Sequence, residues 1–127
     1  MSRYDIPAAQ YMRSPVRTVQ RSTELQAVFA LLNRYRISGV PVSETHESGS
    51  PVVGVITRTD LLALRDLRAG DPRTAGDVMT EGVIAVRAET PLSEVAGTMV
   101  AERVHRVFVV DGERLAGVIT PHELIRA

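Results

Sequence analysis

The stretch Gly54-Val55-Ile56-Thr57-Arg58-Thr59-Asp60-Leu61-Leu62 has a close counterpart near the end of the chain. Gly-Val-Ile-Thr-Pro-His-Glu-Leu-Ile at 117–125 repeats its pattern. Each copy closes a segment of about sixty residues in which the same features follow in the same order. Such an internal repeat indicates that one structural unit occurs twice.

The two segments align at a constant offset of 67 residues before these stretches. The matched pairs include Met12 with Met79, Val16 with Val83, Val19 with Val86, Thr23 with Thr90, Leu25 with Leu92, Val28 with Val95, Arg36 with Arg103 and Val40 with Val107. At the Gly-Val-Ile-Thr blocks the offset falls to 63, so the first copy contains four extra residues, within 43–50. That stretch is rich in Ser, Glu and Gly and is typical of an exposed turn between strands.

Each repeat has the pattern of a strand, a helix, two strands and a second helix. Short strands are predicted at 16–19 and 83–86. One-sided helices follow, because apolar residues recur at spacings of three and four from Leu25 and from Leu92, and Thr23 and Thr90 are the predicted N-caps. Strand pairs are predicted at 40–43 with 52–57 and at 107–110 with 115–120. The predicted fold class is α+β, with two β-α-β-β-α repeats.

The repeats cover 1–67 and 74–127, and residues 68–73 connect them. This connection is too short for a flexible tether, so the repeats should pack directly on each other. The last helix of the first repeat is predicted at 58–67. The last helix of the second repeat is short because the chain stops at Ala127, a pattern that we expect of a piece of a longer polypeptide.

The composition fits one compact protein with no charge bias. The chain has 127 residues, 44% of them hydrophobic, and 15 basic residues balance 15 acidic ones. We therefore expect no nucleic-acid partner, no membrane association and a cytoplasmic location, since no apolar run approaches the roughly 20 residues of a membrane span. The chain has no cysteine and three scattered histidines, so we predict no metal site and no cofactor.

The first repeat resembles a cystathionine beta-synthase (CBS) domain, and the second repeat resembles another. The resemblance is carried by Met12 with Val16 and Val19, Thr23-x-Leu25, Ile37-Ser38-Gly39-Val40-Pro41-Val42 and Gly54-Val55-Ile56-Thr57-x-x-Asp60-Leu61. It covers almost the whole chain and implies a Bateman module, with two repeats packed about a pseudo two-fold axis. It also implies a homodimer that binds AMP, ADP, ATP or S-adenosylmethionine in clefts between repeats and regulates an attached or partner protein.

Thr57 and Asp60 are the first candidate ligand contacts. Thr57 ends a strand and begins a helix, where unpaired backbone N–H groups and the helix dipole favour an anion. The Thr57 hydroxyl can donate to a phosphate oxygen, and Asp60, one helical turn later, can accept from both ribose hydroxyls. By resemblance, the wall around the base consists of Val16, Thr18, Ile37, Ser38, Gly39, Val40 and Pro41.

A purely structural interpretation fits the same spacing. A Thr followed three residues later by an acid is also a capping box, in which the two residues satisfy each other's backbone N–H groups. Thr120 and Glu123 fit the capping box well, and the extra methylene of Glu123 displaces its carboxylate from the position of an Asp. We therefore favour ligand binding for the first copy and helix capping for the second.

His105 and Arg106 are candidate phosphate contacts in the second repeat. They resemble the segment of the AMP-activated protein kinase gamma subunit in which a His-Arg pair reaches nucleotide phosphates, and the planar fork of Arg donors suits that role. The alternative is that Arg106 lies at the surface where a strand begins. The first repeat has Ser38 and Gly39 at these positions, so the two sites should bind phosphate differently.

Two functional classes remain after these arguments. The leading prediction is a regulatory module that senses an adenosine-containing nucleotide and transmits its binding to another protein. The alternative is a structural dimerisation module without a ligand. No residues have the spacing of a nucleophile with its base, so an enzyme is not predicted.

Overall fold

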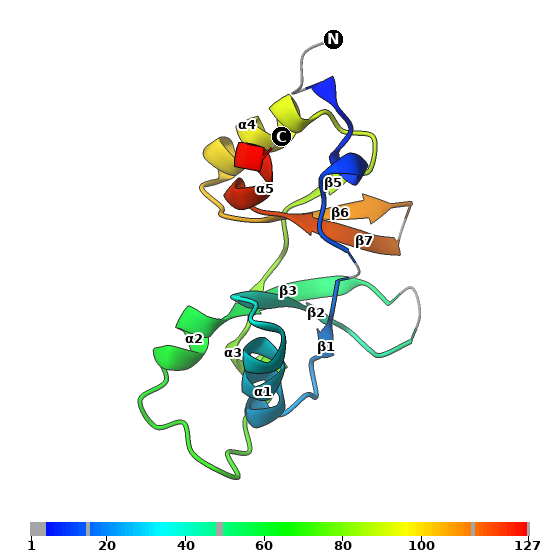
Figure 1. Ribbon diagram of the computed structural model, residues 1–127. Coiled ribbons are helices and arrows are strands. Elements are labelled where there is room, and N and C mark those ends of the chain that lie inside the picture. The colour runs from blue at the N-terminus through cyan, green and yellow to red at the C-terminus, as the bar shows by residue number, and fades with distance from the viewer. Residues whose placement is uncertain (1–4, 15, 48–49, 113, 127) are drawn as a thin grey trace. The chain divides into compact units, whose positions relative to one another are not determined.

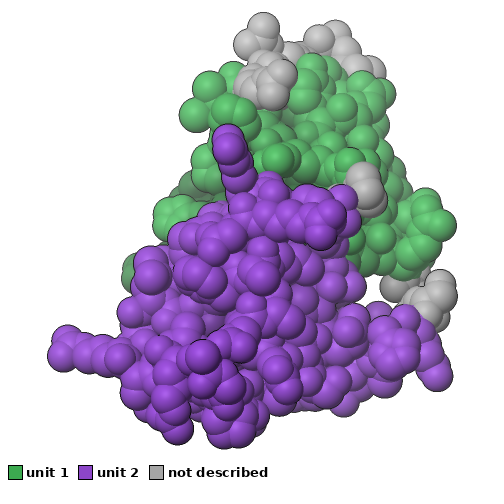
Figure 2. All heavy atoms as spheres, turned by 60° about the horizontal axis from the view of Figure 1, so that its bottom comes forward, with its two compact units in different colours: residues 1–16, 83–127 green, residues 17–82 purple. Residues whose placement is uncertain are grey.

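The computed structural model describes residues 5–14, 16–47, 50–112 and 114–126. The chain folds as two compact units, which Figure 2 distinguishes by colour. Unit 2 comprises residues 17–82, and unit 1 comprises residues 1–16 together with 83–127. Each unit has its own sheet and its own core.

Unit 2 contains the strands and helices of the first repeat. In chain order these are β1 (Val19–Gln20), α1 (Leu25–Tyr35), β2 (Gly39–Ser43), β3 (Val52–Thr57) and α2 (Arg58–Leu62), followed by α3 (Ala75–Val78) and β4 (Thr80–Glu81) (Figure 1). The sheet has the order β1-β2-β3-β4, in which β1 and β2 are parallel and the other neighbours are antiparallel. The predicted order of strand, helix, strand, strand and helix is confirmed.

Unit 1 has the same plan. It consists of η2 (Ala8–Gln10), β5 (Ala85–Arg87), α4 (Leu92–Glu102), β6 (Val107–Asp111), β7 (Arg114–Ile119) and α5 (Pro121–Arg126). Its sheet has the order β5-β6-β7, parallel and then antiparallel. Arg13 forms an antiparallel bridge with Val118 of β7, as Thr80 of β4 does with Val55 of β3. The α+β fold class of two related units is therefore confirmed.

The compact units differ from the sequence repeats, because each sheet is extended by a segment of the other repeat. In unit 2, a Cβ added to Gly54 would lie 2.6 Å from Met79 Sδ and 2.7 Å from the Thr80 carbonyl oxygen. In unit 1, a Cβ added to Gly117 would overlap the side chain of Met12. The glycine that opens each Gly-Val-Ile-Thr motif thus makes room for a methionine from the other repeat.

Each core is formed by one face of the long helix and by the strands beneath it. In α1 the buried residues are Leu25, Val28 and Leu32, and in α4 they are Leu92, Val95 and Met99. These positions follow the three- and four-residue spacing of a helix that buries one side. Completely buried strand residues are Val40, Val42, Ile56, Val107, Val109 and Ile119.

Three details differ from the prediction. The first strands of the two repeats are shorter, at 19–20 and 85–87. The N-caps of α1 and α4 are Glu24 and Pro91. The Thr23 and Thr90 hydroxyls instead accept hydrogen bonds from Gln20 N at 2.9 Å and Arg87 N at 3.1 Å, so they close the turns before the helices.

Helix α2 ends at Leu62, not at residue 67 as predicted. The Leu64 N–H donates to the Leu61 carbonyl and the Leu67 N–H to the Leu64 carbonyl, which is the tighter i to i−3 pattern that ends α-helices. Leu64 and Leu67 then pack against the core of unit 2. After α2 the chain therefore turns so that these two half-buried leucines contact the core.

The predicted connection at 68–73 is held by a buried carboxylate. Asp71 is 4% exposed and accepts hydrogen bonds from Arg73 N at 2.9 Å, Arg73 Nε at 3.1 Å and Arg73 Nη2 at 2.8 Å. These bonds, from the side chain first and then from the backbone, lower the pKa of Asp71 from 3.8 to about 2. The same carboxylate, together with Asp66, raises the pKa of Arg73.

Candidate functional site

The first-repeat candidates meet at one edge of the unit 2 sheet. Strand register places Gly39, the first residue of β2, opposite Thr57, the last residue of β3. The Arg58 N–H donates to the Ser38 carbonyl oxygen at 2.8 Å, which ties the start of α2 to the start of β2. Two separate sequence motifs, 37–41 and 57–60, therefore form one local structure.

The wall residues of this edge differ in exposure. Val40 and Pro41 are buried in β2, and Ile37 is half-buried against the core of unit 2. Ser38 is exposed, and Gly39 is half-buried. The edge therefore places the half-buried Ile37 beside the exposed residue Ser38.

Thr57 and Asp60 form a capping box at the start of α2. Thr57 Oγ1 accepts from Asp60 N at 3.1 Å, and Asp60 Oδ2 accepts from Thr57 N at 2.8 Å. Among the described residues, the Thr57 hydroxyl proton has no acceptor and Asp60 Oδ1 has no donor. The capping interpretation is therefore confirmed, and it leaves one donor and one acceptor for a ligand.

Thr120 and Glu123 are arranged differently at the start of α5. Glu123 Oε1 accepts from Thr120 N at 2.8 Å and also from the Thr120 hydroxyl at 2.8 Å. Glu123 is only 6% exposed. The longer acid thus uses the hydroxyl proton that remains available in the first repeat.

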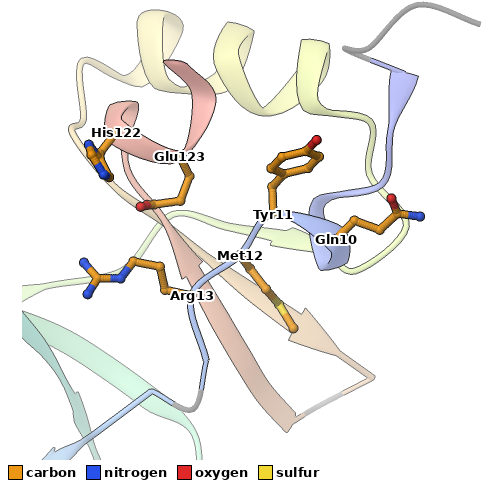
Figure 3. Close-up of a pocket in the computed structure, with 6 residues that line it drawn as sticks. All are labelled: Gln10, Tyr11, Met12, Arg13, His122 and Glu123. Carbon is orange, nitrogen blue, oxygen red and sulfur yellow. The ribbon is translucent and has the colours of Figure 1, made fainter. Parts of the chain in front are cut away.

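Glu123 also lines a pocket within unit 1, which Figure 3 shows in close-up. The pocket has a volume of about 430 Å³, within the range of small-molecule sites. Its other lining residues are Gln10, Tyr11, Met12, Arg13 and His122. His122 and Glu123 come from α5, the other four residues come from the N-terminal segment, and Met12 points toward the strands. Sequence analysis did not group these residues, because 10–13 and 122–123 belong to different repeats.

The remaining candidates lie in both units. Thr18 is half-buried in unit 2, whereas Val16 is half-buried in unit 1. His105 is exposed and Arg106 half-buried immediately before β6 of unit 1. That these residues bind the same ligand as Thr57 and Asp60 stays a prediction.

Neither a metal site nor a membrane-spanning helix is found in the part of the chain that the structure describes. No group of three His, Cys, Asp or Glu side chains there is arranged to hold a metal ion. No helix within the described ranges is long and apolar enough to cross a membrane. Every buried side-chain nitrogen or oxygen among these residues has a hydrogen-bond partner.

The fold is a pair of β-α-β-β-α repeats, each of which places a Thr and, three residues later, an acid where its third strand is followed by a helix. The CBS domain model matches residues 8–66 and 75–127, and the chain belongs to the CBS domain family. The predicted tandem CBS pair is thereby confirmed.

Solved structures of CBS pairs share the fold. The chain is similar to CBSX2, a CBS-pair protein from Arabidopsis thaliana, in a crystal structure of its complex with AMP. The identity is 26%, the match covers 95% of this chain and 94% of that one, and the TM-score is 0.80.

Curated relatives include enzymes that are much longer than this chain. Inosine-5'-monophosphate dehydrogenase of Methanocaldococcus jannaschii is 31% identical over 110 residues, which is 86% of this chain and 21% of that protein. A-adding tRNA nucleotidyltransferase of Geobacter sulfurreducens is 30% identical over 119 residues, 94% of this chain and 13% of that protein. The chain spans about a fifth or less of each relative, and the resemblance concerns CBS repeats.

Proposed function

We propose that this chain is a regulatory CBS pair that binds an adenosine-containing ligand at the edge of unit 2 formed by Thr57, Asp60 and residues 37–41. The observation that carries the proposal is the available pair of the Thr57 hydroxyl proton and Asp60 Oδ1. Both side chains are already fixed by the capping box, so little conformational freedom is lost when a ligand binds.

Each group has a definite role in this proposal. Asp60 Oδ1 accepts from a ribose hydroxyl, and the Thr57 hydroxyl donates to a ligand oxygen. The half-buried Ile37 supplies apolar contact for the base. The AMP complex of CBSX2, which is 26% identical to this chain, supports a ligand of this class.

The regulatory part of the proposal concerns a second protein or domain. A ligand changes the output only if it binds two conformations of the module with different affinity. The matched segment is only 21% and 13% of the two curated relatives, which supports an output through an attached domain. Alternatively, ligand binding changes the activity of a separate partner protein, which is the second form of the same proposal.

We also propose that the module forms a homodimer. Leu62 of α2 and Ile125 of α5 occupy equivalent positions in the two repeats and are 68% and 83% exposed. Val100 of α4 is 80% exposed. Large apolar side chains exposed at equivalent positions favour a contact surface, and sedimentation equilibrium of the wild type and of Leu62→Ser/Ile125→Ser tests it. A monomeric wild type would contradict the dimer.

A structural module without a ligand is the second candidate. It is favoured by the capping boxes, which give Thr57, Asp60, Thr120 and Glu123 a role that requires no ligand. In that case the only role of Asp60 is to stabilise the fold.

A thermal-shift screen against AMP, ADP, ATP, S-adenosylmethionine, NAD and cyclic dinucleotides distinguishes the two. A ligand at a hundred times its dissociation constant adds about 2.7 kcal/mol to the free energy of unfolding. The shift should disappear in Asp60→Ala and persist in Asp77→Ala, a matched control because Asp77 Oδ2 accepts from Thr74 N at 2.9 Å in a similar box. A chain that responds to none of these compounds would contradict the proposed function and favour the structural module.

A further inference from the structure

Four arginines gather at the edge of unit 2 that carries Thr57. Arg17 lies two residues before β1, Arg34 and Arg36 lie at the end of α1, and Arg58 is the first residue of α2. Because β1 and β2 are parallel and β3 is antiparallel to β2, the starts of β1 and β2 and the end of β3 share one edge of the sheet. We call these four residues the arginine cluster.

The cluster is held by aromatic and amide groups. Arg17 Cζ lies 3.5 Å from the centroid of the Tyr35 ring, and Arg34 Cζ lies 5.5 Å from the same centroid. Arg58 Cζ lies 5.9 Å from the Phe29 centroid, and Arg58 Nη1 donates to Asn33 Oδ1 at 2.8 Å. These contacts position guanidinium groups without neutralising their charge.

Two other arginines of unit 2, Arg21 and Arg73, are paired with carboxylates. Arg21 Nε lies 2.8 Å from Glu44 Oε2, and Arg73 Nη2 lies 3.0 Å from Asp66 Oδ1. Within the described ranges, no member of the arginine cluster has an ion pair. The acid at this edge is Asp60, whose Oδ2 accepts from Thr57 N. The edge therefore has an excess of positive charge although the whole chain has none.

The second repeat shows that the fold does not require this cluster. At the positions equivalent to Arg17, Arg34 and Arg58 it has Ile84, Ala101 and Pro121, and Glu102 replaces Tyr35. Only Arg36 has an arginine counterpart, Arg103. Unit 1 nevertheless forms the same helices and strands, so the positive charge at the edge of unit 2 is a separate property of that edge.

We propose that the arginine cluster binds the phosphate chain of the ligand, so that unit 2 selects adenosine di- or triphosphate over AMP, adenosine or S-adenosylmethionine. This inference rests on the proposed function and assigns the ligand class of the same edge. A guanidinium presents a planar fork of donors that matches phosphate oxygens and keeps its charge at all physiological pH values. Several separate guanidinium groups suit a chain of phosphates better than a single phosphate.

The test is isothermal titration calorimetry of adenosine, AMP, ATP and inorganic tripolyphosphate at low salt, where charge interactions are weakly screened. The key variant is Arg17→Gln/Arg34→Gln. Its matched control is Arg65→Gln/Arg68→Gln, which removes the same charge from two exposed arginines after α2. The single variant Arg34→Gln leaves the Arg17 contact with Tyr35 in place, so a difference in stability between it and the key variant shows whether loss of that contact affects folding.

The wild type should bind ATP at least about tenfold more tightly than AMP, the equivalent of one charge-assisted hydrogen bond. The key variant should reduce this ratio about tenfold, mainly through ATP, while the control variant retains it. Equal affinities for ATP and AMP in the wild type, or an unchanged ratio in the key variant, would overturn the inference and leave the proposed function standing. Binding of tripolyphosphate without binding of any adenosine compound would support the cluster as an anion site and contradict the proposed function.

Discussion

The two repeats share a fold and differ where their third strands become helices. In unit 2 the Thr57 hydroxyl accepts a hydrogen bond from Asp60 N, and in unit 1 the Thr120 hydroxyl donates to Glu123 Oε1. The Glu123 carboxylate accepts from both the backbone N–H and the hydroxyl of Thr120, as Asp77 does with Thr74 before α3. Of these two helix starts, only the one in unit 2 leaves both a hydroxyl proton and a carboxylate oxygen available to a ligand.

The residues around Thr57 also differ from those at the equivalent positions of unit 1. Unit 2 has the arginine cluster beside Thr57, while unit 1 has apolar residues and an acid at the equivalent positions. The duplication thus preserves the packing that forms each unit and changes the chemistry at its edge.

The largest effect is expected from filling the glycine that opens each motif. Gly54→Ala should lower the free energy of unfolding by about 1–3 kcal/mol, because the added methyl overlaps Met79 and the Thr80 backbone. Gly117→Ala should cost less, since the atoms nearest its added methyl belong to the Met12 side chain and not to the backbone. Urea denaturation measures both.

Gly97→Ala is the matched control for these variants. Gly97 is exposed in α4 and a Cβ there would meet nothing within 4 Å. Replacing it should raise the free energy of unfolding by about 0.5–1 kcal/mol, because Ala loses less conformational freedom in a helix. If Gly54→Ala stabilised the protein as well, the account of methionine packing would be wrong.

Exchanging the two acids tests the chemistry of the edges. Asp60→Glu should give unit 2 the closed hydrogen bonding of unit 1 and weaken nucleotide binding about tenfold, a loss of about 1.4 kcal/mol. Glu123→Asp should leave the affinity at the edge of unit 2 unchanged, and calorimetric titration measures both variants. Wild-type affinity in Asp60→Glu would show that the carboxylate position does not matter.

The connection at 68–73 predicts a pH dependence of stability. The pKa of Asp71 is about 2 in the folded chain, below its ordinary value of 3.8. The ionised carboxylate therefore stabilises the fold above about pH 4, and this contribution disappears as the pH falls toward about 2. Asp71→Asn should be less stable than the wild type at neutral pH, and the difference should shrink across that range in urea titrations. Asp66→Asn, which removes the more exposed partner of Arg73, is the control, and a difference that stayed constant with pH would exclude this role of Asp71.

The smallest effect is expected at the ends of the long helices. Arg36 and Arg103 have φ angles of 53° and 55°, in the left-handed region where glycine is favoured. Arg103→Gly should raise the free energy of unfolding by about 0.5–1 kcal/mol in thermal unfolding. Arg36→Gly should do the same while removing one charge of the arginine cluster. If Arg103→Gly lowered the free energy of unfolding, the Arg103 side chain would have to stabilise the fold by more than its left-handed backbone conformation costs.

The repeat, the order of its elements and the helix faces could be predicted from the sequence, because they depend on local periodicity. The exchange of N-terminal segments could not. Met12 and Met79 are equivalent, as are Gly54 and Gly117, so the pattern is the same whether each methionine packs within its own repeat or against the other. Only the three-dimensional fold distinguishes these pairings.

The candidate site was predictable as a motif and not as a set of hydrogen bonds. The spacing of Thr57 and Asp60 indicated both a cap and a ligand contact, and the side-chain geometry leaves room for both roles. The arginine cluster was missed because Arg17, Arg34 and Arg58 are far apart in sequence and appeared as ordinary exposed charges. Strand order and helix direction bring them to one edge.

The most direct test of the asymmetry between the repeats is the calorimetric stoichiometry of ATP binding. The account predicts one ATP per chain, binding at least about tenfold weaker in Asp60→Ala and nearly unchanged in Glu123→Ala. Two equal sites per chain, or equal losses in the two variants, would contradict it.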